Sequence, residues 1–387
     1  MTDMIEASRF DELAERNFIG GEWVFTREGY EFDIYDPSNS TVIAEIPLST
    51  HRDITAVMEA AGAASGKWTK LPATARVSAL QATLDYLVLR ADHVTHIIAR
   101  DTGLPAPLAR QDLEAAIAAA RLQLDPAGAK TTAAPGIIAQ ILSWSGPLGI
   151  ALTRLFADLA GGDVAVVKPS LRAPLSLVCL AEAFEAACPV GGVFNIVQGA
   201  GIDVGMALAR QSGLKRVDFQ GSRKTAGMVK LSPARHGIPV ETHLRHVATM
   251  ALGPKDDLDA AASAIAEILF AHAARAGHGG LEVSVPEKRI VALADALAPL
   301  LKRADYGVGD GRNVAPFIAD KFRTQCEANL GAWRAAGAEV LCAAPKPDAR
   351  TRRMGWFVPP QLLLDREGRV ALDPDRPNGP VAVVRPA

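Results

Sequence analysis

The sequence predicts an α/β protein with two domains. Short apolar stretches of strand length alternate with segments whose apolar residues recur at helical spacing. This alternation is typical of parallel strands joined by crossover helices. The chain has 387 residues, whereas single cores stop growing at roughly 250 to 300 residues, so more than one domain is expected. We place one α/β domain at residues 1–246 and a second at residues 247–387.

The charge balance argues against polyanionic partners. Lysine and arginine number 41, aspartate and glutamate number 43, and the net charge is −2. No long-range field attracts nucleic acid or an anionic membrane, so neither is expected as a partner. Hydrophobic residues make up 49% of the chain, which is typical of globular proteins. The absence of a long apolar run and of an apolar signal core predicts a cytoplasmic protein.

The first part of the chain is predicted to be mostly helical. Thr50 and Asp53 have the spacing of a capping box, so a helix is expected to begin after Thr50. Helical spacing then extends over residues 73–124. Residues 127–136, AGAKTTAAPG, interrupt this pattern with Gly, Pro and Thr, and they are expected to lie outside the helices.

Strands and helices alternate from residue 137 onward. The strand candidates of the first domain are IIAQILSW, VAVVKPS, VFNIVQG and RVDFQGS. In the second domain, helices are expected at residues 257–275 and 319–336. The strand AEVLC follows the second of these helices, and a final strand, VAVVRP, ends the sequence.

The four cysteines predict neither a disulfide framework nor a metal site. Cys179 and Cys188 lie in an apolar helical segment, and Cys326 and Cys342 lie in later core elements. Their spacing contains no CxxC pair, so a zinc knuckle is not expected. We interpret the first two as buried structural thiols.

Three segments of the first domain could hold a dinucleotide. Lys168 stands at the carboxyl end of a buried strand, where open α/β sheets place their ligand contacts. Residues 199–205 (GAGIDVG) and 219–227 (FQGSRKTAG) put glycine-rich backbone before a helix, whose free N–H groups suit an anion. Neither segment has the full G-x-G-x-x-G spacing, and glycines at such turns often serve the turn alone.

Taken in order, several segments resemble landmarks of the aldehyde dehydrogenase superfamily. These segments are FIGGEWV, YDPSNSTVIAEIPLS, SWSGPL, VVKPS, PVGGVFNIVQGAG, VDFQGS, KDDLDAA and NGPV. The resemblance implies a Rossmann-type NAD(P)-binding domain and an α/β catalytic domain. It also implies that residues 127–143 are the remnant of a hairpin that joins subunits. Because little sequence follows NGPV, we expect the catalytic domain to be shortened and the protein to form a homodimer instead of the family's tetramer.

The same resemblance indicates that the family's catalytic groups are missing. The family uses a cysteine thiolate, an asparagine amide in an oxyanion hole, and a glutamate that activates water. The asparagine aligns with Ser145 and the glutamate with His243. The nucleophile slot is Gly277 or Gly280, depending on the alignment. Oxidation of aldehydes through a thioester is therefore not expected.

The coenzyme slots are retained in part. The residues expected to contact a bound dinucleotide are Trp144, Lys168, Ser170, Gly201, Gly221 and Ser222. The two carboxylates with which the family holds the ribose rings align with Leu171 and Arg376. Binding of NAD or NADP is therefore possible but expected to be weakened.

A group of polar side chains near the missing glutamate offers an alternative chemistry. Its members are Glu241, His243, Arg245, His246, His272 and His278. In a repurposed non-redox enzyme, His243 or Glu241 would be the base, His278 the acid, and Arg245 or Arg376 an anion clamp. Glu241, His243 and His246 could also bind zinc if this segment is helical. The simpler interpretation is that these side chains are solvated and have no catalytic role.

Three functional hypotheses follow from the sequence. The first is an aldehyde dehydrogenase-like protein without aldehyde oxidation activity that acts as a partner, a scaffold or a binder of a small-molecule ligand. The second is the non-redox enzyme described above. The third is residual NAD(P)-dependent redox activity without a covalent intermediate.

Overall fold

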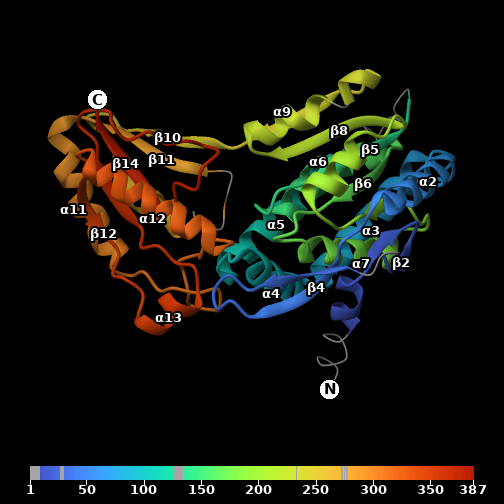
Figure 1. The fold of residues 1–387 in the computed structure, drawn as a ribbon, viewed down its shortest axis with the longest axis horizontal. Helices are drawn as coiled ribbons and strands as arrows, with labels where there is room; N and C mark the ends of the chain where they lie inside the picture. The colour runs from blue at the N-terminus through green and yellow to red at the C-terminus, as the bar shows by residue number, and fades with distance from the viewer. Residues whose placement is uncertain are drawn as a thin grey trace. The chain divides into compact units, whose positions relative to one another are not determined.

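The computed structural model describes residues 9–26, 30–124, 134–231, 233–271, 273, 275 and 278–387. The chain divides into two compact units (Figure 1). Unit 2 comprises Leu244–Ala387 with the short segments Asp36–Thr41 and Thr102–Leu108, and unit 1 comprises the rest. The expected boundary after residue 246 lies three residues from this division, and no sequence pattern indicated the two short segments.

Within the described residues, the sheet of unit 1 has seven strands in the order β2-β1-β7-β6-β5-β8-β9. Their bounds are β1 (Asn17–Ile19), β2 (Glu22–Val24), β5 (Ile137–Ile141), β6 (Val164–Lys168), β7 (Phe194–Ile196), β8 (Leu214–Gly221) and β9 (Val240–Leu244). β7, β6, β5 and β8 pair in parallel, whereas β1 is antiparallel to both β7 and β2. The central order, third-second-first-fourth along the chain, is that of a Rossmann-type sheet. The α/β class predicted from the sequence is thus confirmed.

Helices and a hairpin complete unit 1. Their bounds are β3 (Glu31–Tyr35), β4 (Val42–Pro47), α2 (His51–Trp68), α3 (Ala73–Leu89), α4 (Ala91–Thr102), α5 (Ala106–Gln123), α6 (Pro147–Gly161), α7 (Leu175–Ala187), α8 (Met206–Ala209) and α9 (Arg223–Leu231). The capping box predicted at Thr50 is present, because the Asp53 carboxylate accepts the Thr50 N–H at 2.8 Å. Residues 127–133 of the expected hairpin remnant lie outside the described residues.

The predicted helical run over residues 73–124 is divided into α3, α4 and α5. The break after α4 follows from Gly103, whose φ of +81° is a conformation that L side chains rarely adopt. A Cβ on Gly103 would also lie 2.8 Å from Pro37 and 2.9 Å from Pro316. Periodicity could not show this break, because it results from tertiary packing.

Unit 2 is built around a second sheet, of order β10-β11-β14-β13-β12 among the described residues. Its elements are β10 (His246–Ala251), α10 (Leu258–Ala271), β11 (His278–Val285), α11 (Ile290–Leu301), α12 (Asp320–Ala335), β12 (Glu339–Ala343), α13 (Ala349–Met354), β13 (Gln361–Leu364) and β14 (Val381–Pro386). β10, β11, β14 and β13 pair in parallel, and β12 is antiparallel to β13.

The side chains of β14 alternate between two cores of unit 2. Ala382 and Val384 pack with α10 and α11 residues, whereas Val381 and Val383 pack with Cys326 and other residues of the opposite face. This period of two is the ordinary geometry of a strand buried on both faces. Across the described part of the chain, no helix combines the length and apolar character that crossing a bilayer requires.

Candidate functional site

Four loops of unit 1 meet at the carboxyl edge of its parallel sheet. Ser145 follows β5, Lys168 ends β6, Gly199 follows β7 and Ser222 follows β8. Open α/β sheets bind ligands at this edge, next to the point where the strand order reverses. Here that point lies at β5, between its neighbours β6 and β8. The edge therefore provides the setting that a dinucleotide requires.

Lys168 is the buried cation of this edge. Its side chain is 2% exposed, and burial lowers the pKa of its ammonium from 10.5 to about 8. The Nζ atom donates hydrogen bonds to the carbonyl oxygen of Gly199 at 3.0 Å and to that of Pro169. An ammonium has three N–H donors, so one donor remains beyond these two backbone contacts.

The loop after β7 is shaped by glycine. Gly199 has a φ of +143°, and a Cβ there would lie 2.5 Å from the side chain of Val204. A π-helical turn, Gly201–Gly205, follows and leads into α8. Gly205 packs against the Lys168 stem, because a Cβ on Gly205 would lie 3.3 Å from Lys168 Cδ. The glycine-rich segment identified in the sequence thus lies beside Lys168, with Gly201 exposed.

The loop after β8 presents a capped helix N-terminus. The Ser222 hydroxyl accepts the Thr225 N–H at 3.1 Å, which is the contact of an N-cap residue with α9. The residue before Ser222 is Gly221. A side chain is disfavoured at this position, because a Cβ would lie 2.6 Å from the Phe219 ring. The partial positive charge of a helix N-terminus favours a phosphate, which supports the placement of Ser222 and Gly221 among the coenzyme contacts.

Gln220 holds the loop that contains the oxyanion slot. Its amide accepts the Ser143 N–H and donates to the Ser145 carbonyl oxygen, both at 3.3 Å. Trp144 and Ser145 are each 8% exposed. Gln220 therefore fixes the conformation of the loop that carries Trp144 and Ser145.

Arg216 lies near the amino end of β8, opposite Ile138 of β5, and contacts three carboxylates. It binds Asp218 through Nε at 2.7 Å and Asp158 through Nη2 at 2.6 Å, and Glu241 lies 3.6 Å from Nε. Burial by itself would lower the pKa of Arg216, but hydrogen bonds to Asp218 and Asp158 outweigh it and raise that pKa. This ion-pair group was not recognised in the sequence, where its members lie on three separate elements.

The histidine at the glutamate slot lies on a strand. Glu241 and His243 occupy β9 and His246 begins β10, so the helical reading that would put His243 and His246 one turn apart is wrong. Burial, followed by the charge of Arg154, lowers the pKa of His243. Its Nε2 atom is buried and has no hydrogen-bond partner among the described residues. A neutral imidazole is therefore expected at neutral pH.

The four cysteines are all poor nucleophiles. Burial is the main cause that raises the pKa of each thiol, to about 11 for Cys188 and Cys342 and to about 12 for Cys326. For Cys179 the pKa lies well above 9.0. Since the thiolate is the reactive form, none of these side chains is prepared to attack an aldehyde at neutral pH.

Unit 2 holds two positions that the sequence alignment matched to functional residues of the family, a nucleophile and a ribose-binding carboxylate. Neither position carries the family's residue. Gly280, in β11, has a φ of +118°, and a Cβ there would lie 3.1 Å from the Leu372 side chain. Arg376 is exposed and pairs with Asp373 at 3.3 Å. Burial lowers the pKa of Arg245, and the charge of Asp375 opposes this effect. His272, Gly277 and the side chain of His278 lie outside the described part of the chain.

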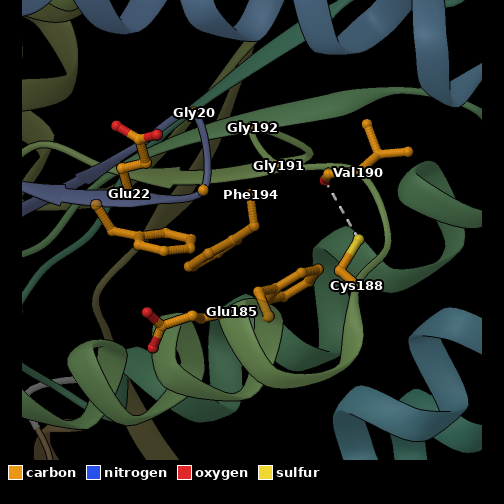
Figure 2. Close-up of a pocket in the computed structure, with 11 residues that line it drawn as sticks. Gly20, Glu22, Glu185, Cys188, Val190, Gly191, Gly192 and Phe194 are labelled. Carbon is orange, nitrogen blue, oxygen red and sulfur yellow. Dashed lines mark hydrogen bonds between the residues drawn. The ribbon is translucent and has the colours of Figure 1, made fainter.

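A separate pocket lies at the other side of unit 1, between the β1–β2 turn and the loop after α7. Its volume is about 220 Å³. Figure 2 shows Glu22 and Glu185 at one end, Phe194 in the middle, and Cys188 at the other end, where its thiol donates to Val190. Lys168 and Ser222 are not among its lining residues, so it is distinct from the carboxyl edge. No sequence motif pointed to this pocket.

Comparison with known proteins identifies the relatives of this chain. The sequence profile described as the aldehyde dehydrogenase family matches residues 23–387. The 3,6-anhydro-alpha-L-galactose dehydrogenase of Streptomyces coelicolor is 26% identical over 89% of this chain and 74% of its own length. The alpha-ketoglutarate semialdehyde dehydrogenase of Haloferax volcanii is 28% identical over 95% of this chain and 80% of its own length.

A solved structure has the same fold. The NAD⁺ complex of aldehyde dehydrogenase from Bacillus cereus superposes with a TM-score of 0.90 at 24% identity, and covers 99% of this chain and 81% of that one. The Rossmann-type sheet and the second α/β unit expected from the sequence are thereby confirmed.

Proposed function

Because this chain belongs to the aldehyde dehydrogenase family, we propose that it binds a dinucleotide-like ligand in unit 1 without oxidising aldehydes through a thioester. The family relatives named above are dehydrogenases. The proposed loss of function concerns the covalent step, and it rests on the state of the thiols.

The observation that carries the proposal is that no thiol is activated. Activated cysteines lie near a helix N-terminus, a cation or a metal, and they have lowered pKa values. All four cysteines of this sequence have raised pKa values instead, with burial as the first cause. The residues that align with the family's catalytic groups support the same conclusion: Ser145 at the asparagine, His243 at the glutamate, and Gly277 or Gly280 at the cysteine.

The ligand class follows from the carboxyl edge of unit 1. Ser222 and the N-terminus of α9 would hold a phosphate, and the remaining Lys168 donor would reach a ribose hydroxyl. A bound nicotinamide accepts a hydride, but in this chain no thiolate is available to prepare an aldehyde for that transfer. Because the Lys168 ammonium is already engaged by two backbone carbonyls, we expect binding that is weaker than a free ammonium would give.

A non-redox acid–base enzyme is the second candidate, and His243 favours it. Its lowered pKa and its unpartnered Nε2 are the properties of an imidazole that accepts a proton. Glu241, the other candidate base, lies 3.6 Å from Arg216 Nε, and this ion pair holds its carboxylate. This candidate requires a substrate whose turnover falls in a His243→Gln variant.

Calorimetric titration with NAD⁺ and NADP⁺ tests the proposal. We expect a Kd between about 1 µM and 1 mM, which corresponds to about −8 to −4 kcal/mol. A Lys168→Met variant should weaken binding at least about tenfold, or about 1.4 kcal/mol. Lys302→Met, an exposed lysine of unit 2, is the matched control and should bind like the parent protein. No heat and no thermal stabilisation at millimolar coenzyme would refute the proposal.

A further inference from the structure

Three side chains of unit 1 with different metal-ligating atoms converge away from the carboxyl edge. They are His93 on α4 and Cys179 and Glu182 on α7. One ring nitrogen, the thiol sulfur and one carboxylate oxygen all lie within 4.8 Å of one another. Among the described residues, this is the group of His, Cys, Asp and Glu side chains that could hold a metal ion.

We propose that His93, Cys179 and Glu182 form a binding site for a zinc ion. Nitrogen, thiolate sulfur and carboxylate oxygen are the atoms with which proteins bind Zn²⁺. In a tetrahedral zinc site, bond lengths of about 2.0 to 2.3 Å put ligand atoms about 3.5 Å apart. The present separations, at most 4.8 Å, exceed this value by no more than about 1.3 Å, a difference that side-chain rotation on two helices can close.

The helix geometry holds two of the ligands together. Cys179 and Glu182 are three residues apart on α7, so both project from the same face. Cys179 is 2% exposed and Glu182 is 8% exposed. Together, a thiolate and a carboxylate carry the two negative charges that match a divalent ion.

The surroundings of the three ligands are polar. Asp101 accepts the Leu175 and Ser176 N–H groups through Oδ2, and burial raises the pKa of its carboxyl group well above 3.8. Asp101 Oδ1 and the Ser176 hydroxyl are buried without a hydrogen-bond partner among the described residues. Buried polar atoms of this kind are usually satisfied by ordered water or by an ion. Burial, Glu182 and Asp101 raise the pKa of the Cys179 thiol and Arg90 opposes them only in part, so the thiol has to release its proton when a metal ion binds.

Sequence spacing could not reveal this site. The ligands come from two helices that are far apart in the chain, and no short motif joins them. The sequence-based expectation about metals considered only the spacing of the cysteines and a conditional zinc site of Glu241, His243 and His246, none of which includes these three ligands together.

Cobalt substitution tests the proposal on the full chain. The protein is treated with a chelator and titrated with Co²⁺ under reducing conditions, while absorption is recorded. We expect one Co²⁺ per chain, a thiolate-to-cobalt band in the near ultraviolet, and loss of that band when Zn²⁺ is added. Absence of a thiolate band at saturating Co²⁺ would overturn the proposal.

Two ligand variants and a matched control distinguish zinc bound at the proposed site from zinc bound elsewhere on the protein. Cys179→Ser and His93→Gln should each lower Zn²⁺ affinity at least about 100-fold, the upper end of what loss of a supporting partner costs. Cys188→Ser removes a thiol just beyond the end of the same helix and should bind zinc like the parent. His93→Gln keeps the thiol, so it remains informative if Cys179→Ser does not fold. Unchanged affinity in His93→Gln, or a thiolate band retained in Cys179→Ser, would contradict the site.

Thermal unfolding provides a second readout. Zn²⁺ should raise the Tm of the parent and of Cys188→Ser, since a ligand that binds only the folded state stabilises it. The Tm of His93→Gln should not respond at the same zinc concentration. An equal rise in all three proteins would indicate zinc bound elsewhere and would refute the assignment.

Discussion

Lys168 donates a hydrogen bond to the carbonyl oxygen of Gly199 at 3.0 Å, and this contact ties the end of β6 to the loop after β7. The two residues come from neighbouring parallel strands of unit 1. Because Lys168 is buried, its charge is costly, and the backbone carbonyls offset only part of that cost.

The buried ammonium predicts a specific dependence of stability on pH. The pKa of Lys168 is about 8 in the folded chain against 10.5 for an unperturbed lysine, so the unfolded state binds more protons between these values. Stability should therefore rise with pH from about 8 to 10.5, by about 3 kcal/mol at most, since a tenfold change in the proton equilibrium is worth about 1.4 kcal/mol. Urea unfolding of the parent and of Lys168→Met measures this difference.

As the pH rises, the free energy of unfolding of the parent should increase relative to that of Lys168→Met. Lys302→Met controls for the loss of one surface charge. A difference that stays constant from pH 7.5 to pH 10 would contradict the buried, weakly basic Lys168, whatever the absolute stability of the variant.

The contact between Gly221 and Phe219 predicts a large effect from one methyl group. In Gly221→Ala the new Cβ would overlap the ring, which should lower the free energy of unfolding by about 1 to 3 kcal/mol. Gly227, inside α9, has no atom within 4 Å of an added Cβ. Gly227→Ala should instead stabilise the helix by up to about 1 kcal/mol. Denaturant unfolding measures the change in free energy of unfolding for both variants. If both variants are destabilised, or both are stabilised, the described packing of Gly221 is contradicted.

Arg216 predicts a contrast between a buried and an exposed ion pair. Arg216→Ala leaves Asp218, which is 3% exposed, without its bidentate partner, and should cost about 3 kcal/mol of unfolding free energy. Arg366 pairs with Glu287 at the surface, where both side chains are about half exposed. Arg366→Ala should leave the urea midpoint unchanged within error. Similar losses in the two variants would argue against the Arg216 arrangement.

Gly280 is one of the two positions that align with the family's cysteine, and its backbone conformation is not expected to accept a cysteine. A φ of +118° and the nearby Leu372 side chain disfavour any Cβ, so Gly280→Cys should destabilise the protein by about 1 to 3 kcal/mol. It should also fail to oxidise aldehydes. Gly309→Ala, at a position with open space, is the control for a general effect of losing glycine. A stable Gly280→Cys protein that reduces coenzyme would overturn this interpretation of the slot.

Local signals in the sequence were sufficient for the four central strands of unit 1, β5 to β8, and for the capping box at Thr50. Their patterns depend on near neighbours, as in the apolar run of β6 that ends at Lys168. The strands β9 and β10 were not distinguished from a helix, because the short polar segment around His243 has no apolar periodicity. The break at Gly103 depends on packing against Pro37 and Pro316, which no local pattern contains.

The candidate site was predictable in part. Lys168, Gly221 and Ser222 could be assigned to one edge, because each follows or ends a strand of the same parallel sheet. The Arg216 group and the three zinc ligands could not be found, since their members meet only after the elements fold together. The protonated state of the thiols likewise depends on burial, which spacing does not reveal.

The central claim is that this family member makes no thioester with an aldehyde, and one measurement tests it most directly. The protein is incubated with NAD⁺ or NADP⁺ and with 3,6-anhydro-α-L-galactose, α-ketoglutarate semialdehyde or acetaldehyde, and intact mass and coenzyme reduction are recorded together. The S. coelicolor relative serves as the positive control. Our account predicts no acyl adduct and no reduced coenzyme above background. Reduced coenzyme together with an acyl adduct on any of the four cysteines would contradict it.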